Sequence, residues 1–386
     1  MKLLRIEANG IYLFNKNVVI DFFAEQRISH KNDECLYNVF NNIYINNAIS
    51  FVGINASGKT LSLKLVTFVI KMLNAEPINN IEIRSIFDRS INVKLNIYFY
   101  DDKYGICLLK TIIKPISTNN KARKYIIDSE RLYTRKINSN ISKNKILSFR
   151  EKDLFKTRDT NEEQQLFLKD DVSIIISLGK DNKIPLYETL EQTDDNFINV
   201  IGSFPSELVQ FLDPSIEYFR IDSKNSEIAL KFYKDSDKIM LHDFNSIKNY
   251  LSSGTIKGLY VFMDAWATLM EGGYLIIDEI ENHFNKEIVA SLIRFFMDES
   301  LNHRGAVIVY STHYAELLDI LERSDCIYVL NNKNGIELRK FNYIFKRNDI
   351  KKSVAYESDS LVGTAPSYES YIKLKKVLAS GEIKEK

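Results

Sequence analysis

The segment Gly53–Thr60 reads GINASGKT and limits the possible folds of this chain more than any other stretch, because it matches the P-loop pattern G-x-x-x-x-G-K-[ST]. Such a loop needs a strand before it and a helix after it. Residues 48–52 (AISFV) predict a short buried strand, and residues 60–74 predict a helix that is apolar on most faces. The flanks therefore favour a phosphate-binding loop over an ordinary glycine turn that contains a lysine by chance.

Each P-loop position has its own chemical task. Gly53 and Gly58 allow the backbone to wrap closely around phosphate groups with its N–H groups pointing inward. Lys59 would reach the β- and γ-phosphates of ATP, and the hydroxyl of Thr60 would bind Mg²⁺. We therefore expect ATP and Mg²⁺ as ligands of this loop.

Two carboxylates follow another apolar run, YLIIDEIEN at Tyr274–Asn282. Its first residues predict a buried strand, and the carboxyl ends of such strands are where α/β sheets place ligands. Asp278 would hold Mg²⁺, and Glu279 would act as the general base that orients the attacking water. The alternative is a strand that ends in solvated carboxylates, and the presence of a P-loop disfavours it.

A histidine follows the next predicted strand, in the run VIVYSTH at Val307–His313. At that position His313 could touch the γ-phosphate and sense hydrolysis, which makes it a third catalytic candidate beside Lys59 and Glu279. The alternative is a surface or core histidine without a catalytic role.

The stretch LSSGT at residues 251–255 precedes an apolar helix and has two interpretations. Ser and Gly are favoured helix N-caps because they satisfy the first free N–H groups of a helix. The same N–H groups can instead bind a phosphate. Nothing within the stretch decides between these interpretations.

The order of predicted elements indicates an α/β fold with a mostly parallel sheet flanked by helices, because strands alternate with helices after residue 245. Period-two alternation around the DDKYG turn predicts an antiparallel hairpin. We expect a head formed by residues 1–100 and 245–386, an antiparallel β lobe at 101–140, and an inserted, mostly helical lobe at 141–244.

Composition indicates a reducing compartment and gives no global electrostatic preference. The formal net charge is +1, so binding to nucleic acid would need a local patch. The three cysteines show neither close pairs nor a zinc pattern. No apolar run is typical of a signal peptide or a membrane span. We therefore expect a cytoplasmic protein without membrane contact.

Taken in order, GINASGKT, LSSGT, YLIIDEIEN and STH resemble the motifs of ABC-type ATPases, which share an LSxG signature. The resemblance is closest to the soluble branch of SMC, RecF and the overcoming-lysogenisation-defect ATPases. In that branch the P-loop commonly reads G-x-N-x-S-G-K, and this chain has Asn55 and Ser57 at the matching positions. The resemblance implies that both residues bind nucleotide. It covers about residues 1–100 and 245–370 and implies a P-loop NTPase of the ABC-head type.

This resemblance also implies a head-to-tail dimer with two ATP molecules. Ser252, Ser253 and Gly254 of one copy would close over the γ-phosphate that Lys59 of the other copy holds. ABC ATPases also have a glutamine that contacts Mg²⁺. None of the candidates follows a convincing predicted strand; they are Gln164, Gln165, Gln192 and Gln210.

The gap between Thr60 and Leu251 has no sustained heptads, which excludes an SMC-type rod. The residues after His313 contain no cluster of acidic residues of the kind that a fused metal-dependent nuclease would need. We therefore expect a stand-alone ATPase head. Proteins of the kind that it resembles are often ATPase components of bacterial antiphage or abortive-infection systems, so the resemblance implies that it controls a separate effector protein. The alternatives are a RecF-like DNA-binding repair ATPase and a scaffold that binds ATP without hydrolysing it.

A basic region between residues 119 and 152 bears on the DNA-binding alternative. Interleaved aromatic residues make it a candidate surface for a nucleic-acid backbone, although such a face is more often simply solvated. Only Asp128, Glu130 and Glu151 oppose its charge. Its basic residues are Lys121, Arg123, Lys124, Arg131, Arg135, Lys136, Lys143, Lys145, Arg150 and Lys152.

Overall fold

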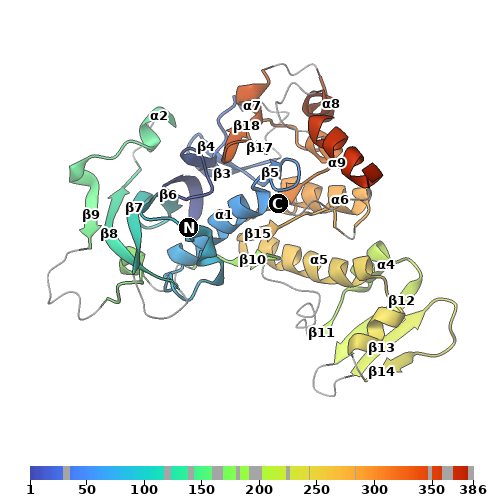
Figure 1. Ribbon diagram of the computed structural model, residues 1–386. Helices are drawn as coiled ribbons and strands as arrows, with labels where there is room; N and C mark the ends of the chain where they lie inside the picture. The colour runs from blue at the N-terminus through green and yellow to red at the C-terminus, as the bar shows by residue number, and fades with distance from the viewer. Residues whose placement is uncertain are drawn as a thin grey trace.

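A six-stranded sheet forms the centre of the molecule (Figure 1). Five of its strands run parallel, and the sixth pairs antiparallel at one edge. In sheet order the strands are β10 (Leu186–Glu188), β15 (Tyr274–Ile277), β16 (Val307–Thr312), β5 (Ala48–Val52), β17 (Ile327–Asn332) and β18 (Ile336–Lys340). The computed structural model describes residues 1–28, 35–116, 123–137, 143–158, 168–179, 183–190, 202–222, 227–242, 244–282, 284–346, 350–358 and 368–380.

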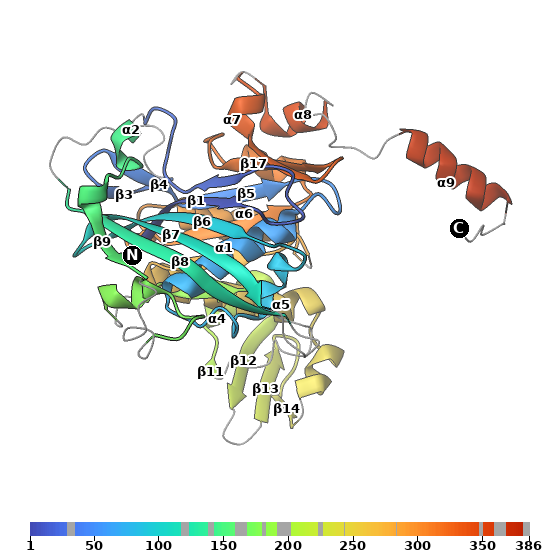
Figure 2. The ribbon, with the colours of Figure 1, turned by 60° about the vertical axis from the view of Figure 1, so that its left-hand side comes forward.

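Helix α1 (Lys59–Leu73) is packed between this central sheet and a second sheet of six antiparallel strands. Its apolar side chains share one core with Phe51 and Val309 of the central sheet and with Leu95 and Leu109 of the second. Figure 2 shows the second sheet lying over α1. In sheet order its strands are β2 (Val18–Asp21), β1 (Lys2–Asn9), β6 (Val93–Asp101), β7 (Gly105–Ile116), β8 (Lys124–Arg135) and β9 (Leu154–Thr157).

Two helices, α5 (Ser253–Glu271) and α6 (Lys286–Met297), cover the opposite face of the central sheet. Val261 of α5 and Ile293 of α6 share a core with Ile277 of β15. The parallel strands are therefore buried on both faces, which is why their sequences are almost entirely apolar rather than alternating. The expected mostly parallel α/β architecture agrees with this arrangement.

The expected lobe boundaries are wrong. The antiparallel sheet extends well beyond 101–140, because it takes β1, β2 and β6 from the expected head and β9 from the expected insertion. The described part of 141–244 is also not mostly helical. Its main feature is a third, antiparallel sheet that packs with α4 (Ser206–Leu212) on α5; its strands are β11 (Gly202–Ser203), β12 (Ile216–Asp222), β13 (Glu227–Phe232) and β14 (Ile239–Leu241).

The reason for this error is the shortness of the strands. Phe219 and Ile221 of β12, like Ile228 and Leu230 of β13, alternate with more exposed residues and point into a core that also contains Leu259 of α5. Two or three apolar positions per strand, set among charged residues, do not distinguish a period of two from a helical period.

Short elements complete the fold. Strands β3 (Leu36–Phe40) and β4 (Ile43–Asn46) form a hairpin. The remaining helices are α2 (Lys143–Ile146), α7 (Phe341–Ile344), α8 (Lys352–Glu357) and α9 (Tyr368–Ser380). The 3₁₀ turns are η1 (Glu82–Phe87), η2 (Glu151–Asp153), η3 (Ile174–Leu178), η5 (Phe244–Asn249) and η6 (Ala315–Asp319). In the described part of the chain, every helix is too short or too polar to cross a lipid bilayer.

A buried carboxylate fixes η3 against the antiparallel sheet. Glu130 on β8 is 1% exposed and accepts hydrogen bonds from the backbone N–H of Ile174 (2.7 Å) and the hydroxyls of Ser173 (2.7 Å) and Thr111 (3.0 Å). Nη2 of Arg158 lies 3.7 Å from Oε2 of the same carboxylate. Because every one of these neighbours is a donor, the site needs a group with acceptor oxygens only.

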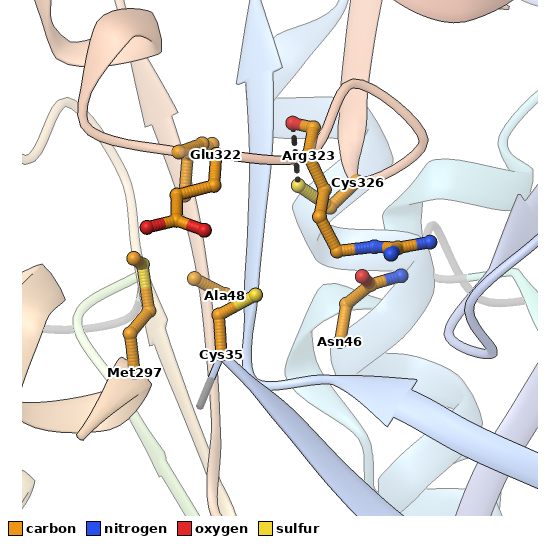
Figure 3. A pocket seen from close by; sticks show the side chains of 8 residues that line it. Cys35, Asn46, Ala48, Met297, Glu322, Arg323 and Cys326 are labelled. Atoms are coloured by element: carbon orange, nitrogen blue, oxygen red, sulfur yellow. Dashed lines mark hydrogen bonds between the residues drawn. The ribbon is translucent and has the colours of Figure 1, made fainter. Parts of the chain in front are cut away.

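A small pocket lies between the β3–β4 hairpin, the C-terminal end of α6 and the segment before β17 (Figure 3). The thiols of Cys35 and Cys326 line this pocket, and both are buried. Burial raises the pKa of Cys35 to about 11 and also raises the pKa of Cys326. These thiols are therefore poor nucleophiles. The lining residues are Cys35, Asn46, Ala48, Met297, Leu321, Glu322, Arg323 and Cys326.

Candidate functional site

The P-loop connects β5 to α1, as the sequence predicts, and its two glycines lie where no other residue fits. Gly58 has φ 103°, and an added Cβ would lie 2.6 Å from the side chain of Ile336. At Gly53 a Cβ would lie 2.4 Å from Oγ of Ser57 and 2.7 Å from the carbonyl oxygen of Leu330. The loop is thus a tight backbone turn that leaves no room for side chains at these two positions.

Lys59 is folded back into the loop. It is 5% exposed, and its Nζ donates to the carbonyl oxygens of Gly53 (2.8 Å) and Ile54 (3.1 Å). Burial lowers the pKa of Lys59, while the carboxylates of Asp278 and Glu279 act in the opposite direction. The ammonium is therefore held at the centre of the loop, close to two acids.

The P-loop helix and β15 meet through the two residues expected to hold Mg²⁺. Oγ1 of Thr60 donates to Oδ2 of Asp278 at 2.6 Å. A hydroxyl beside a carboxylate is the hard-oxygen donor set that Mg²⁺ prefers. No cluster of three or more His, Cys, Asp or Glu that could hold a metal occurs in the described ranges.

Glu279 and His313 lie together beyond Asp278. Nε2 of His313 is 3.3 Å from Oε1 of Glu279, and Nδ1 of the same ring is 3.3 Å from Nζ of Lys59. Asn282 donates to Oε2 of Glu279 at 2.6 Å. This hydrogen bond lowers the pKa of Glu279 most, followed by the effect of His313. The carboxylate therefore remains ionised, as a general base requires.

The structure thus brings Lys59, Thr60, Asp278, Glu279 and His313 into one site, and their roles in nucleotide binding and hydrolysis stay predictions. Asn55 is exposed, whereas Ser57 is buried and its Oγ has no hydrogen-bond partner in the part of the chain that the structure describes. A buried hydroxyl without a partner beside a glycine turn fits a loop whose remaining partner is a ligand.

The signature stretch begins α5. Ser252 is its N-cap, and its Oγ accepts a hydrogen bond from the backbone N–H of Thr255 at 3.0 Å. The N-cap interpretation is therefore confirmed. Leu251 packs in the core of the third sheet, so this stretch lies where that sheet meets α5. Contact of Ser252, Ser253 and Gly254 with a phosphate stays a prediction.

Strand β10 is the part of the site that the sequence analysis missed. It pairs in parallel with β15, and Oγ1 of Thr189, just after it, accepts a hydrogen bond from the N–H of Asp278 at 3.3 Å. In the sequence, Gln192 comes four residues after the end of β10, a strand that the sequence patterns did not predict. Gln164, Gln165 and Gln192 lie outside the described residues; Gln210 is on α4 and bonds to Tyr233.

The basic region is divided among several structural contacts. Arg135 donates to the carbonyl oxygens of Lys145 and Ile146, and Arg131 lies 3.6 Å from Glu151. Part of its charge is therefore used within the protein. Lys121 lies outside the described residues.

The fold and this site define an α/β P-loop NTPase. A comparison with curated proteins gave no match. The chain belongs to the family described as "AAA domain, putative AbiEii toxin, Type IV TA system", whose model matches residues 113–319, more than half of the chain. The match runs from β7 to η6, so it includes α5 and β15, and the P-loop precedes it. Membership supports a P-loop ATPase of the abortive-infection type.

Proposed function

We propose that this protein is an ABC-head-type ATPase that hydrolyses ATP with Mg²⁺, dimerises head to tail around two ATP molecules and controls a separate effector in abortive infection. The observation that carries the proposal is the line of contacts from Lys59 through His313 to Glu279. It joins a phosphate-binding lysine to an ionised general base, next to the oxygen pair of Thr60 and Asp278.

In this mechanism the P-loop backbone and Lys59 bind the β- and γ-phosphates of ATP. Thr60 and Asp278 would hold Mg²⁺, which neutralises phosphate charge. Glu279 accepts a proton from a water molecule as the water oxygen bonds to the γ-phosphorus, and the bond from that phosphorus to the bridging oxygen of ADP breaks. His313 lies between Glu279 and Lys59 and keeps these two side chains at a fixed separation.

The dimer proposal rests on the resemblance to ABC-type ATPases and on the start of α5. Ser252 and Ser253 are exposed at the N-terminus of this 19-residue helix. Helix N-termini favour anions because unpaired N–H groups and the helix dipole both point there. A second copy related by a two-fold axis would supply this N-terminus to each ATP.

The decisive test compares the wild type with Glu279→Gln and, as a matched control, with Glu287→Gln at the exposed start of α6. We expect Glu279→Gln to lower turnover at least about 100-fold, because general bases contribute about 10²–10⁴-fold. It should still dimerise in ATP, as measured by light scattering. Unchanged turnover would refute the general-base role, and ATP-saturated monomers would refute the dimer.

Effector control is tested by affinity purification with the Glu279→Gln chain, which should hold ATP and remain closed. A protein that co-purifies only with ATP supports the proposal. Co-purifying DNA would instead support the RecF-like alternative.

One observation favours that alternative. Lys110 lies 5.1 Å from the ring centre of Tyr133 on the antiparallel sheet, and Arg135 lies 4.8 Å from that of Phe149, in the segment between α2 and η2. Nucleic-acid binding through phosphate contacts would weaken steeply with salt. Binding that is absent or indifferent to salt would exclude it. Absent turnover by the wild type would favour the non-hydrolysing scaffold.

A further inference from the structure

One buried serine contacts both acidic residues at the end of β15. Ser311 lies near the end of β16 and is 0% exposed. Its Oγ donates a hydrogen bond to Oδ1 of Asp278 and accepts one from the backbone N–H of Glu279 at 2.7 Å. Its carbonyl oxygen also accepts a hydrogen bond from the N–H of Ile280 at 3.0 Å. Three consecutive residues after β15 are thus held by one residue of the neighbouring strand.

The first consequence concerns the direction of the Asp278 carboxylate. Ser311 bonds to one of its oxygens, and Thr60 donates to the other at 2.6 Å. With Oδ1 occupied by a buried donor, only Oδ2 faces the P-loop. The hydroxyl of Ser311 therefore sets the orientation of the oxygen that would bind Mg²⁺.

The second consequence concerns the backbone of Glu279. This residue has φ 48°, a left-handed conformation that non-glycine residues rarely adopt and that persists only where neighbouring groups hold it. The hydrogen bond from its N–H to Ser311 is one such constraint. Without it the carboxylate can leave the place where Asn282 and His313 bind it.

The geometry points to Ser311 as a positioning residue for ATP hydrolysis: one hydroxyl aligns the Mg²⁺-binding carboxylate of Asp278 and the general base Glu279 together. This inference rests on the proposed ATPase function. Ser311 does not touch the nucleotide in this scheme, so it acts through the two acids.

A buried serine can also matter only for packing, and the chain offers a matched control. Ser50 on β5 is likewise 0% exposed and pairs with Tyr310, the residue before Ser311. Because successive side chains of a strand point to opposite faces, the side chain of Ser50 lies on the other face of the sheet from that of Ser311. Ser50→Ala therefore removes an equally buried hydroxyl without touching the Asp278–Glu279 turn.

The experiment measures kcat, KM for ATP, the Mg²⁺ concentration at half-maximal activity and the melting temperature for Ser311→Ala, Ser311→Thr and Ser50→Ala. Since a hydrogen bond to a charged group is worth at least about tenfold, we expect Ser311→Ala to lower kcat about tenfold or more. The Mg²⁺ midpoint should rise about tenfold, and KM should stay within about threefold. Ser311→Thr keeps the hydroxyl and should recover most of both losses. Ser50→Ala should change neither kcat nor the Mg²⁺ midpoint by more than about twofold.

Two outcomes would overturn the inference. One is a Ser311→Ala enzyme with wild-type kcat and Mg²⁺ midpoint, and the other is an equal loss in Ser50→Ala, which would show a general packing effect. If Ser311→Ala does not fold, Ser311→Cys keeps the size with a weak donor and should show an intermediate loss. If the wild type itself does not hydrolyse ATP, the proposed function fails, but the Mg²⁺ dependence of ATP binding still tests Ser311.

Discussion

Replacing Lys59 by methionine separates nucleotide binding from folding at this site. In the structure the ammonium donates to the carbonyl oxygens of Gly53 and Ile54 and lies close to His313. With ATP bound, we expect the same group to contact the β- and γ-phosphates. Methionine keeps an unbranched apolar side chain one heavy atom shorter than that of lysine, so the substitution removes the ammonium with its charge and its donors.

The size of each effect can be worked from these contacts. A hydrogen bond to a charged group contributes about 1.5–3 kcal/mol, so ATP affinity should fall by about 10- to 150-fold. In the free protein, the loss of a donor to partly buried carbonyls costs about 1–3 kcal/mol. Removal of a charge whose pKa burial lowers offsets part of that cost. The free energy of unfolding should therefore change by less than about 2 kcal/mol.

ATP affinity is measured by isothermal titration calorimetry, and the free energy of unfolding is measured by urea titration. Lys64→Met on the same helix is the control. Because the pKa of Lys59 lies below that of an ordinary lysine, wild-type affinity should also decline earlier than expected as the pH rises into the alkaline range. An ATP affinity of Lys59→Met within about threefold of the wild type would refute the proposed role of the lysine.

Three further results are expected. Asn282→Ala removes the hydrogen bond that most lowers the pKa of Glu279, so the acidic limb of the pH profile of kcat should move to higher pH. At neutral pH kcat should fall only about two- to fivefold, because the Glu279 side chain is 43% exposed. An acidic limb that does not move would contradict this prediction. Glu130→Gln leaves buried donors unpaired and should lower the free energy of unfolding by about 2–3 kcal/mol, as measured by urea titration. The control Glu151→Gln changes an exposed residue and should lower it by less than about 0.5 kcal/mol. Equal effects would count against the buried network. The three buried thiols, with the pKa of Cys35 raised to about 11, should react with a thiol reagent at pH 8 only after unfolding, and rapid labelling of the native chain would show that they are accessible.

Sequence patterns were most informative where the chemistry is local. The P-loop and the carboxylates after β15 could be found without a structure because each depends on fixed spacing within a single strand–loop unit. The prediction of a helical insertion failed because β12 and β13 are stabilised by packing on α5, and a few alternating apolar residues do not reveal that partner.

The sequence by itself determined which residues can bind phosphate and accept a proton, because these tasks need particular side chains on particular turns. Tertiary structure alone decided their neighbours. The register of β16 against β15 and β5 brings His313 between Lys59 and Glu279 and places Ser311 beneath Asp278, and the parallel pairing of β10 brings Thr189 to the same turn. Contacts between strands depend on sheet order and register, which arise from packing of the whole core rather than from any local pattern.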